Sequence, residues 1–150
     1  MDKVSKVCRG ELINMTKVFI GCVKQKNAGR LKAKNKYASA LFKYELAYAK
    51  KLVSEKDIYI LSAKYGLITL DTVIDDYDLT LKYFSEHQRK EWAYKVVMQA
   101  SKFGINKNEE IIFLCGEHYS KYLKRYYRNH KDPTQGLCIG KTLKFYKDNI

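Results

Sequence analysis

Four aspartates lie close together in the middle of a basic chain. Within eight positions of the sequence stand Asp71, Asp75, Asp76 and Asp78. Clustered carboxylates repel one another, so they persist where they cap turns and helices, bind a cation, or take part in proton or oxocarbenium-ion chemistry. No histidine or regular ligand spacing accompanies them, so we predict no metal site and no cofactor. We take Asp75, Asp76 and Asp78 as candidate catalytic carboxylates, with turn and cap residues around Tyr77 as the alternative.

Three short apolar runs of the sequence end in small or hydroxyl residues. The first ends at Gly21 and Cys22, the second at Ser62 and Ala63, and the third at residues 115–116. If the three strands are parallel, these ends lie on one edge of a sheet, where ligands bind in open α/β folds. Small residues there let a ligand approach the backbone closely. The pattern predicts a pocket at this edge, and the alternative is that small residues simply end the strands.

Side chains near these strand ends are the candidate ligand contacts. Lys24 and Lys26 suit anion binding better than nucleophilic attack, and Cys22 is either a nucleophile or, as we favour, a small buried residue. Tyr65 or Tyr77 could stack on a base extruded from a nucleic acid. The predicted substrate contacts are Cys22, Lys24, Lys26, Ser62, Ala63, Tyr65, Gly66, Tyr77, Gly116 and His118.

The chain carries a large excess of positive charge. It has 29 Lys and Arg against 16 Asp and Glu, a formal charge of +13, and 13 tyrosines. Cations contact phosphates and aromatic rings stack on bases, so this composition favours a nucleic acid as partner, with DNA favoured over RNA. The alternative is a solvated lysine-rich surface. The predicted nucleic-acid contacts lie on a basic, tyrosine-rich helix and are Lys121, Lys124, Arg125 and Arg128.

The elements that position these residues follow from the spacing of apolar side chains. Runs rich in β-branched and aromatic residues predict strands at 17–23, 58–62 and 110–116. Helical spacing predicts helices over 37–54, 85–103, 117–129 and 141–148. Alternating strands and helices imply right-handed crossovers and parallel strands. We therefore predict one α/β domain over residues 17–150, with a small, mainly parallel sheet flanked by helices, and a leader or edge segment at 1–16.

Two of these helices carry further signals. The helix over 85–103 begins at a capping box formed by Ser85 and Gln88, and it stops at Gly104. The broad face of the helix over 37–54 consists of Ala38, Leu41, Phe42, Glu45, Ala49, Leu52 and Val53. The preceding residues 24–36 are predicted to form a basic loop.

Several classes of protein are excluded by what the sequence lacks. No apolar stretch reaches the length of about 18 residues that a membrane span needs, and the first residues do not form a secretory signal. The four cysteines are scattered without Cys-x-x-Cys pairs, which predicts a cytoplasmic protein with reduced thiols. A phosphate-binding P-loop motif is also absent, because residues 136–142 have one residue too few between their glycines.

Five segments together resemble a widespread prokaryotic and phage domain of unknown function. They are FIGCVKQK, YILSAKYGLI, VIDDYDLTL, FLCGEHYSKYL and GLCIGKTLKFY, and the resemblance extends from about residue 17 to residue 147. The second and third segments are also similar to a part of the YaaA-type peroxide-resistance proteins, which are linked to DNA binding. The first resembles the opening of archaeosine synthase, which modifies a deazaguanine base in tRNA through a lysine. These remote resemblances imply action on or around nucleic acid.

The sequence leads to one main functional hypothesis and two alternatives. The main hypothesis is an enzyme of glycosylase or base-modifying type that acts on a base or nucleotide in nucleic acid, with its pocket floored by Ser62, Ala63 and Gly66. One aspartate of the acidic run would act as base or stabilise an oxocarbenium ion. The first alternative is a non-enzymatic DNA-binding stress or phage accessory protein. The second is an enzyme acting on a small nucleotide. The sequence leaves the oligomeric state open.

Overall fold

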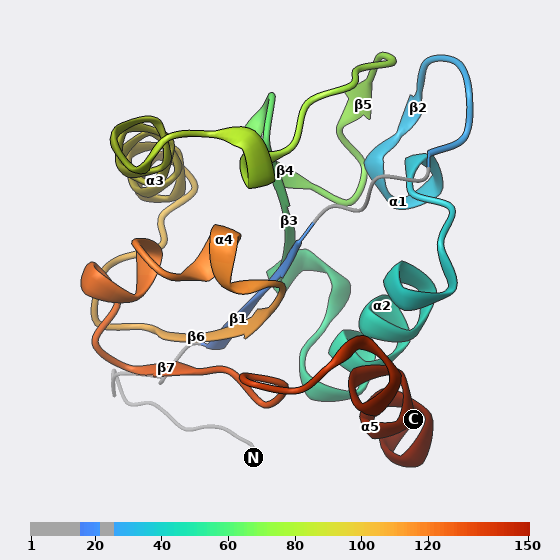
Figure 1. Cartoon of the computed structure of the whole chain (residues 1–150). Coiled ribbons are helices and arrows are strands. Elements are labelled where there is room, and N and C mark those ends of the chain that lie inside the picture. The colour runs from blue at the N-terminus through green and yellow to red at the C-terminus, as the bar shows by residue number, and fades with distance from the viewer. Residues whose placement is uncertain (1–15, 22–25) are drawn as a thin grey trace.

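A five-stranded sheet forms the centre of the molecule, in the order β4-β3-β1-β6-β7 (Figure 1). The computed structural model describes residues 16–21 and 26–150. β1, β3, β6 and β7 run parallel, and β4 pairs antiparallel with β3. This confirms the predicted α/β fold with a small, mainly parallel sheet. The strands are β1 (Thr16–Gly21), β3 (Ile58–Ser62), β4 (Gly66–Thr69), β6 (Glu110–Leu114) and β7 (His130–Lys131).

Helices and one small ribbon surround this sheet. The α-helices are α1 (Ala33–Lys36), α2 (Ala40–Leu52), α3 (Glu86–Lys102), α4 (Glu117–Ser120) and α5 (Ile139–Asn149). Short 3-10 turns are η1 (Glu55–Asp57), η2 (Leu81–Tyr83) and η3 (Leu123–Arg125). A two-stranded antiparallel ribbon consists of β2 (Leu31–Lys32) and β5 (Val73–Ile74). None of the described helices has both the length and the apolar character that a membrane crossing requires.

The central strands are buried on both faces, which explains their nearly unbroken apolar runs. Because successive side chains point to opposite faces, Val18 and Ile20 pack with α2 and α5, whereas Phe19 packs with α3. Figure 1 accordingly shows α2 and α5 together on one side of the sheet, with α3 and α4 on the other. The chain thus buries two cores, one on each side of β1.

The turn between β3 and β4 depends on a glycine. Gly66 has a φ of +79°, a conformation that residues with a Cβ atom rarely adopt. A Cβ atom here would also lie 2.1 Å from the Gln99 side-chain oxygen. That oxygen accepts a hydrogen bond from the Leu67 N–H at 2.8 Å, and the Gln99 amide donates to the Tyr65 carbonyl at 3.0 Å. Gly66 therefore lets α3 fasten the β3–β4 hairpin, a strand pair that the sequence reading did not predict.

Two helices follow their predicted local signals closely. The Ser85 side chain accepts from the Gln88 N–H at 3.1 Å, and the Gln88 side chain accepts from the Ser85 N–H at 2.8 Å, which confirms the capping box of α3. α2 starts later than predicted because the Ser39 side chain caps it by accepting from the Phe42 N–H. Residues 26–36, predicted as a loop, instead contain β2 and α1.

The single helix predicted over residues 117–129 is wrong. The chain instead forms α4, a link and η3, and then turns toward β7. In this arrangement Tyr122, Leu123 and Tyr127 are buried in the core on the α3 side, and Tyr119 and Tyr126 pack against that core. The tyrosines of this segment are therefore largely core residues rather than an exposed aromatic face.

Candidate functional site

The predicted alignment of strand ends is present in the fold. β1 pairs in parallel with β3 on one side and with β6 on the other, so their carboxyl ends lie along one edge of the sheet. The connections from β1 and β3 leave in opposite directions across the sheet, which makes the β1–β6 boundary the place where ligands bind in such folds. A Cβ atom on Gly21 would lie 2.6 Å from the Cys115 Cβ atom, so the glycine allows these strand ends to pack closely. The predicted contacts Cys22 and Lys24 lie outside the described residues.

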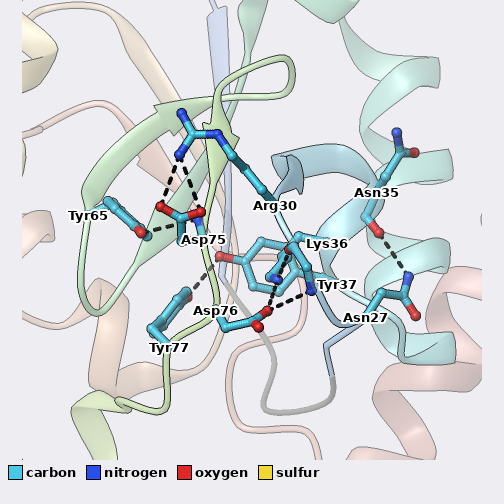
Figure 2. A network of polar contacts seen from close by, with 10 residues as sticks. Asn27, Arg30, Asn35, Lys36, Tyr37, Tyr65, Asp75, Asp76 and Tyr77 are labelled. Carbon is cyan, nitrogen blue, oxygen red and sulfur yellow. Dashed lines mark hydrogen bonds and ion pairs between the residues drawn. The ribbon is translucent and has the colours of Figure 1, made fainter.

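Part of the predicted pocket is a network of hydroxyl groups at the end of β3. The Ser62 hydroxyl donates to the Tyr77 hydroxyl at 3.1 Å and accepts from the Tyr65 N–H, also at 3.1 Å. The Tyr37 and Tyr77 hydroxyls lie 2.8 Å apart, as Figure 2 shows. The Lys26 ammonium group lies 4.4 Å from the centre of the Tyr77 ring. The fold thus brings together four predicted contacts, Lys26, Ser62, Tyr65 and Tyr77.

The acidic run is occupied by ion pairs (Figure 2). Asp76 accepts from the Gly29 N–H at 2.9 Å and from the Lys36 ammonium group. Lys36 itself is 0% exposed, so this exposed carboxylate compensates an enclosed cation. The hydrogen bond from Lys36, followed by that from Gly29, lowers the pKa of Asp76. Arg30 pairs with Asp75 at 3.0 Å. These two aspartates tie the segment after β5 to residues 29–36.

The remaining predicted contacts are dispersed. Asp78 is exposed, Ala63 is buried beside β3, and Gly116 with His118 lies at the start of α4. The predicted nucleic-acid contacts do not share one face. The Lys121 and Arg125 side chains lie over the Tyr122 ring, whereas Lys124 turns to Asp132. Arg128 is exposed in the turn before β7.

A cavity of about 650 Å³ opens at the carboxyl end of β6. Its walls come from α2, from the segment after β7 and from the first turn of α5. The polar side chains that line it are Glu45, Cys115, Glu117, Lys124, Asp132, Thr134, Gln135, Cys138 and Thr142. This volume falls within the range of about 300–1,000 Å³ that is typical of small-molecule sites.

Glu45 is the unusual side chain of this cavity. It occupies the buried stripe of α2 between Phe42 and Ala49, and it is only 4% exposed. Across the described part of the chain, its Oε1 atom finds no hydrogen-bond partner. Burial raises the pKa of Glu45 well above its ordinary value of 4.5, because a charged carboxylate would be poorly solvated here. Burial thus favours the protonated form of Glu45.

Asp132 provides a second carboxyl group in a different environment. It follows β7 directly, and its Oδ2 atom lies 2.9 Å from the Lys124 ammonium group. The two side chains are 6% and 16% exposed, so the ion pair is largely buried. The other oxygen, Oδ1, has no hydrogen-bond partner within the described ranges. A carboxyl group that is ion-paired with a lysine and has a spare acceptor atom therefore lines the same cavity as Glu45.

The Cys115 thiol lines the same cavity as Glu45 and Asp132. Burial is the largest cause that raises the pKa of Cys115, and the nearby carboxyl groups of Asp132 and Glu45 raise it further. Their influence on the sulfur indicates that both carboxyl groups lie near it. A raised pKa keeps Cys115 as a thiol, which disfavours it as a nucleophile. Nowhere in the described ranges do three or more His, Cys, Asp or Glu side chains gather in a geometry that could hold a metal ion.

The arrangement suits acid–base chemistry. A carboxyl group whose pKa is raised by burial and a second one that is ion-paired with a lysine can divide the roles of proton donor and proton acceptor. Glu45 lies on the apolar face of the helix predicted over 37–54, but it is not among the predicted site residues. The signal that could have identified it is the presence of a charged residue among the apolar positions of that face. Asp132 carried no comparable signal, because only the fold brings it beside Glu45.

The fold and this cavity define a small α/β protein with a ligand-sized site at the carboxyl edge of a mainly parallel sheet. The chain belongs to a family of unknown function (DUF6884), whose sequence profile matches residues 18–148. This agrees with the predicted resemblance to a domain of unknown function. A comparison with curated proteins finds no match.

Proposed function

We propose that the protein is an enzyme that breaks the N-glycosidic bond of a nucleotide or of a nucleoside unit in nucleic acid. The observation that carries this proposal is that one cavity holds both the buried Glu45, whose pKa is raised by burial, and the ion-paired Asp132. The cavity volume of about 650 Å³ suits a single nucleoside unit. The protein's own groups supply both proton transfers of the hydrolysis.

The reaction uses the two carboxyl groups in turn. Glu45 gives its proton to the departing base as the C1′–N bond breaks, and the sugar becomes an oxocarbenium-like ion. The Asp132 carboxylate stabilises this positive charge and takes a proton from the water that forms the new C1′–O bond. Glu45 is then ionised and Asp132 is protonated. Transfer of that proton from Asp132 to Glu45, directly or through solvent, restores the enzyme.

Nucleic acid is the favoured source of the substrate. The formal charge of +13 supports attraction to a polyanion. The remote resemblance of the chain to YaaA-type proteins and to archaeosine synthase supports a target at or near a nucleic-acid base. A base within a duplex would have to leave the stack to enter the cavity.

A second candidate function is DNA binding without catalysis. The observation in its favour is that Lys121, Arg125 and Arg128 are exposed on the segment between β6 and β7. In that case phosphate contacts alone would determine the affinity of the protein for DNA, and this affinity would fall steeply as the salt concentration rises. Substitution of Glu45 or Asp132 would then leave the protein's function intact.

The test is a search for released bases. Purified protein is incubated with natural and base-modified DNA, RNA and free nucleotides, and released bases are measured by mass spectrometry. We expect release by the wild type and a loss of about 10²–10⁴-fold in Glu45→Gln and in Asp132→Asn. Glu55→Gln, an exposed position at the opposite edge of the sheet, serves as control and should match the wild type.

Two results would contradict the proposal. One is base release that is equal in the wild type and in folded Glu45→Gln and Asp132→Asn proteins. The other is salt-sensitive DNA binding without any base release, which would favour the non-enzymatic alternative. Circular dichroism of each variant shows whether it is folded.

A further inference from the structure

A second, smaller cleft of about 150 Å³ lies beside the cavity. Its lining side chains are Arg89, Glu117, His118, Lys121 and Tyr122. We propose that this cleft binds a phosphate group of the substrate, so that the enzyme acts on a phosphorylated nucleoside unit rather than on a free nucleoside. This inference rests on the proposed function, because it assigns the substrate class of the same site.

The position of the cleft connects it to the cavity. Glu117, the first residue of α4, lines both spaces. α4 begins directly after the carboxyl end of β6, at the edge of the sheet where the cavity opens. Glu117 is therefore shared by the cavity and the cationic cleft. A nucleotide that spans Glu117 could place its sugar in the first space and its phosphate in the second.

The charges around the cleft favour an anion. Three cations lie over the Tyr122 ring. The Arg125 guanidinium is 4.8 Å from the centre of the ring, the Lys121 ammonium group is 5.5 Å from it, and the Lys90 ammonium group is 5.8 Å from it. With Arg89 this makes four cations, against the two carboxylates of Glu86 and Glu117. The pKa of Glu86 is lowered first by the Tyr122 hydroxyl and then by Lys90, Lys121 and Arg125. These cations therefore already stabilise one anion beside the cleft, the Glu86 carboxylate.

Arg89 gives the cleft a fixed donor. Its Nε atom donates to the Leu81 carbonyl at 2.9 Å, and its Nη2 atom donates to the Lys82 carbonyl at 2.8 Å. These bonds hold the planar guanidinium in place before any ligand arrives. A preorganised guanidinium recognises phosphate well, because its donors match the spacing of the phosphate oxygens. Lys121 adds a mobile, exposed ammonium group to this fixed donor.

The cleft has room for a phosphate group. Its volume is about 150 Å³, and its charges rather than its size favour an anion. The Tyr122 side chain is buried and forms a rigid wall. Glu117 opposes the charge of the ligand, so its substitution by glutamine should strengthen phosphate binding.

The first experiment measures binding without turnover. Isotope-labelled full-length protein is titrated with inorganic phosphate and observed by NMR. We expect amide shifts at residues 117–122, an affinity that falls roughly tenfold in Lys121→Gln, and a gain in Glu117→Gln. Lys51→Gln, an exposed position at the end of α2 by the opposite edge of the sheet, should match the wild type. Phosphate shifts spread evenly over surface lysines and unaffected by Lys121→Gln would overturn the proposal.

The second experiment uses turnover and separates the two proposals. For a substrate that releases its base, KM is compared for the nucleoside, its 5′-monophosphate and a short oligonucleotide. Lys121→Gln should raise KM roughly tenfold for the phosphorylated forms, leave the nucleoside unchanged, and leave kcat unchanged. Tighter binding of the monophosphate or of the oligonucleotide identifies the source of the phosphate.

The outcomes of the two experiments are distinct. If phosphate binds at residues 117–122 but no substrate is cleaved, the proposed function fails and the phosphate site stands. If bases are released with the same KM from the nucleoside and its phosphorylated forms, in both wild type and Lys121→Gln, the phosphate site fails and the proposed function stands.

Discussion

Asp75 and Asp76 stand next to each other in the sequence and lie at the surface, whereas Glu45 and Asp132 come from distant parts of the chain and are buried. Each aspartate of the first pair is bound by a cation, Arg30 or Lys36. Each carboxyl group of the second pair has an oxygen atom without a hydrogen-bond partner in the described part of the protein. The two regions therefore use the same chemical group for opposite purposes.

The difference follows from solvation. Neighbouring aspartates can remain ionised only where water or cations compensate their charges, so a dense acidic run tends to lie at the surface. The pKa of Asp76 is lowered by Lys36 and Gly29, while that of Glu45 is raised by burial. A lowered pKa makes a carboxylate a poor proton donor, and a raised one makes it a good donor near neutral pH. The acidic run thus stabilises the fold, and the cavity holds the groups suited to catalysis.

The largest difference in stability should come from breaking one ion pair in each region. Lys124→Met leaves Asp132 as an uncompensated buried charge, so we expect a loss of about 3–5 kcal/mol in the free energy of unfolding. Arg30→Met leaves Asp75 exposed to water and should cost at most about 1 kcal/mol. Urea denaturation of both variants measures these values. Similar losses in the two proteins would show that the cavity pair is solvated like the surface pair.

A second difference should appear in the dependence of stability on pH. Above pH 4.5, the ordinary pKa of glutamate, the unfolded chain releases the Glu45 proton while the folded chain keeps it. The folded state then binds more protons, so this group lowers stability as pH rises, with a slope of up to about 1.4 kcal/mol per pH unit until the raised pKa is reached.

Glu45→Gln removes this titration. Its free energy of unfolding should therefore rise relative to that of the wild type between pH 4.5 and the raised pKa, and the two should run parallel below pH 4.5. Denaturation curves at several pH values measure the difference. A difference that is constant with pH would mean that Glu45 is ionised in the folded protein, and Glu45 could then not act as the proposed acid.

Within the acidic run, the two partners of one ion pair should respond unequally. Asp76→Asn leaves the enclosed Lys36 cation without its carboxylate, whereas Lys36→Met leaves only an exposed carboxylate that water can solvate. We therefore expect Asp76→Asn to lower the melting temperature more than Lys36→Met does. The pKa of Asp76 is lowered in the folded state. The contribution of this carboxylate to folding stability is therefore full above pH 3.8 and is lost as the pH falls below that value. Melting curves at neutral and acidic pH test both statements.

The elements were more predictable from the sequence than the site. Buried parallel strands leave a continuous apolar run, and a capped helix leaves a local signal at Ser85, so both could be recognised without the fold. From the sequence, Gly66 is assigned to the floor of a pocket and no strand is predicted directly after 58–62, so the β3–β4 hairpin is known only from the structure. The segment 117–129 was misassigned because charge and aromatic content do not show which tyrosines are buried.

The site was only partly predictable, because its chemistry depends on tertiary contacts. The common edge of the strand ends follows from topology, and it was found. The protonation state of Glu45 depends on burial by α5 and the segment after β7, which no local pattern reports. The acidic run was conspicuous in the sequence because its residues are adjacent. Because neighbouring carboxylates repel one another, the same aspartates must also remain in contact with water or with cations.

The smallest expected effect is that of Asp75→Asn. The carboxyl group of Asp75 is 59% exposed and pairs with a guanidinium that is 67% exposed, so the free energy of unfolding should change by less than about 0.5 kcal/mol. Base release by this variant should equal that of the wild type, because Asp75 lies in the surface network and not among the residues that line the cavity. A large loss of activity with unchanged stability would transfer the catalytic role back to the acidic run. The comparison of Asp75→Asn with Asp132→Asn, which carry the same chemical change, therefore decides which of the two regions performs the reaction.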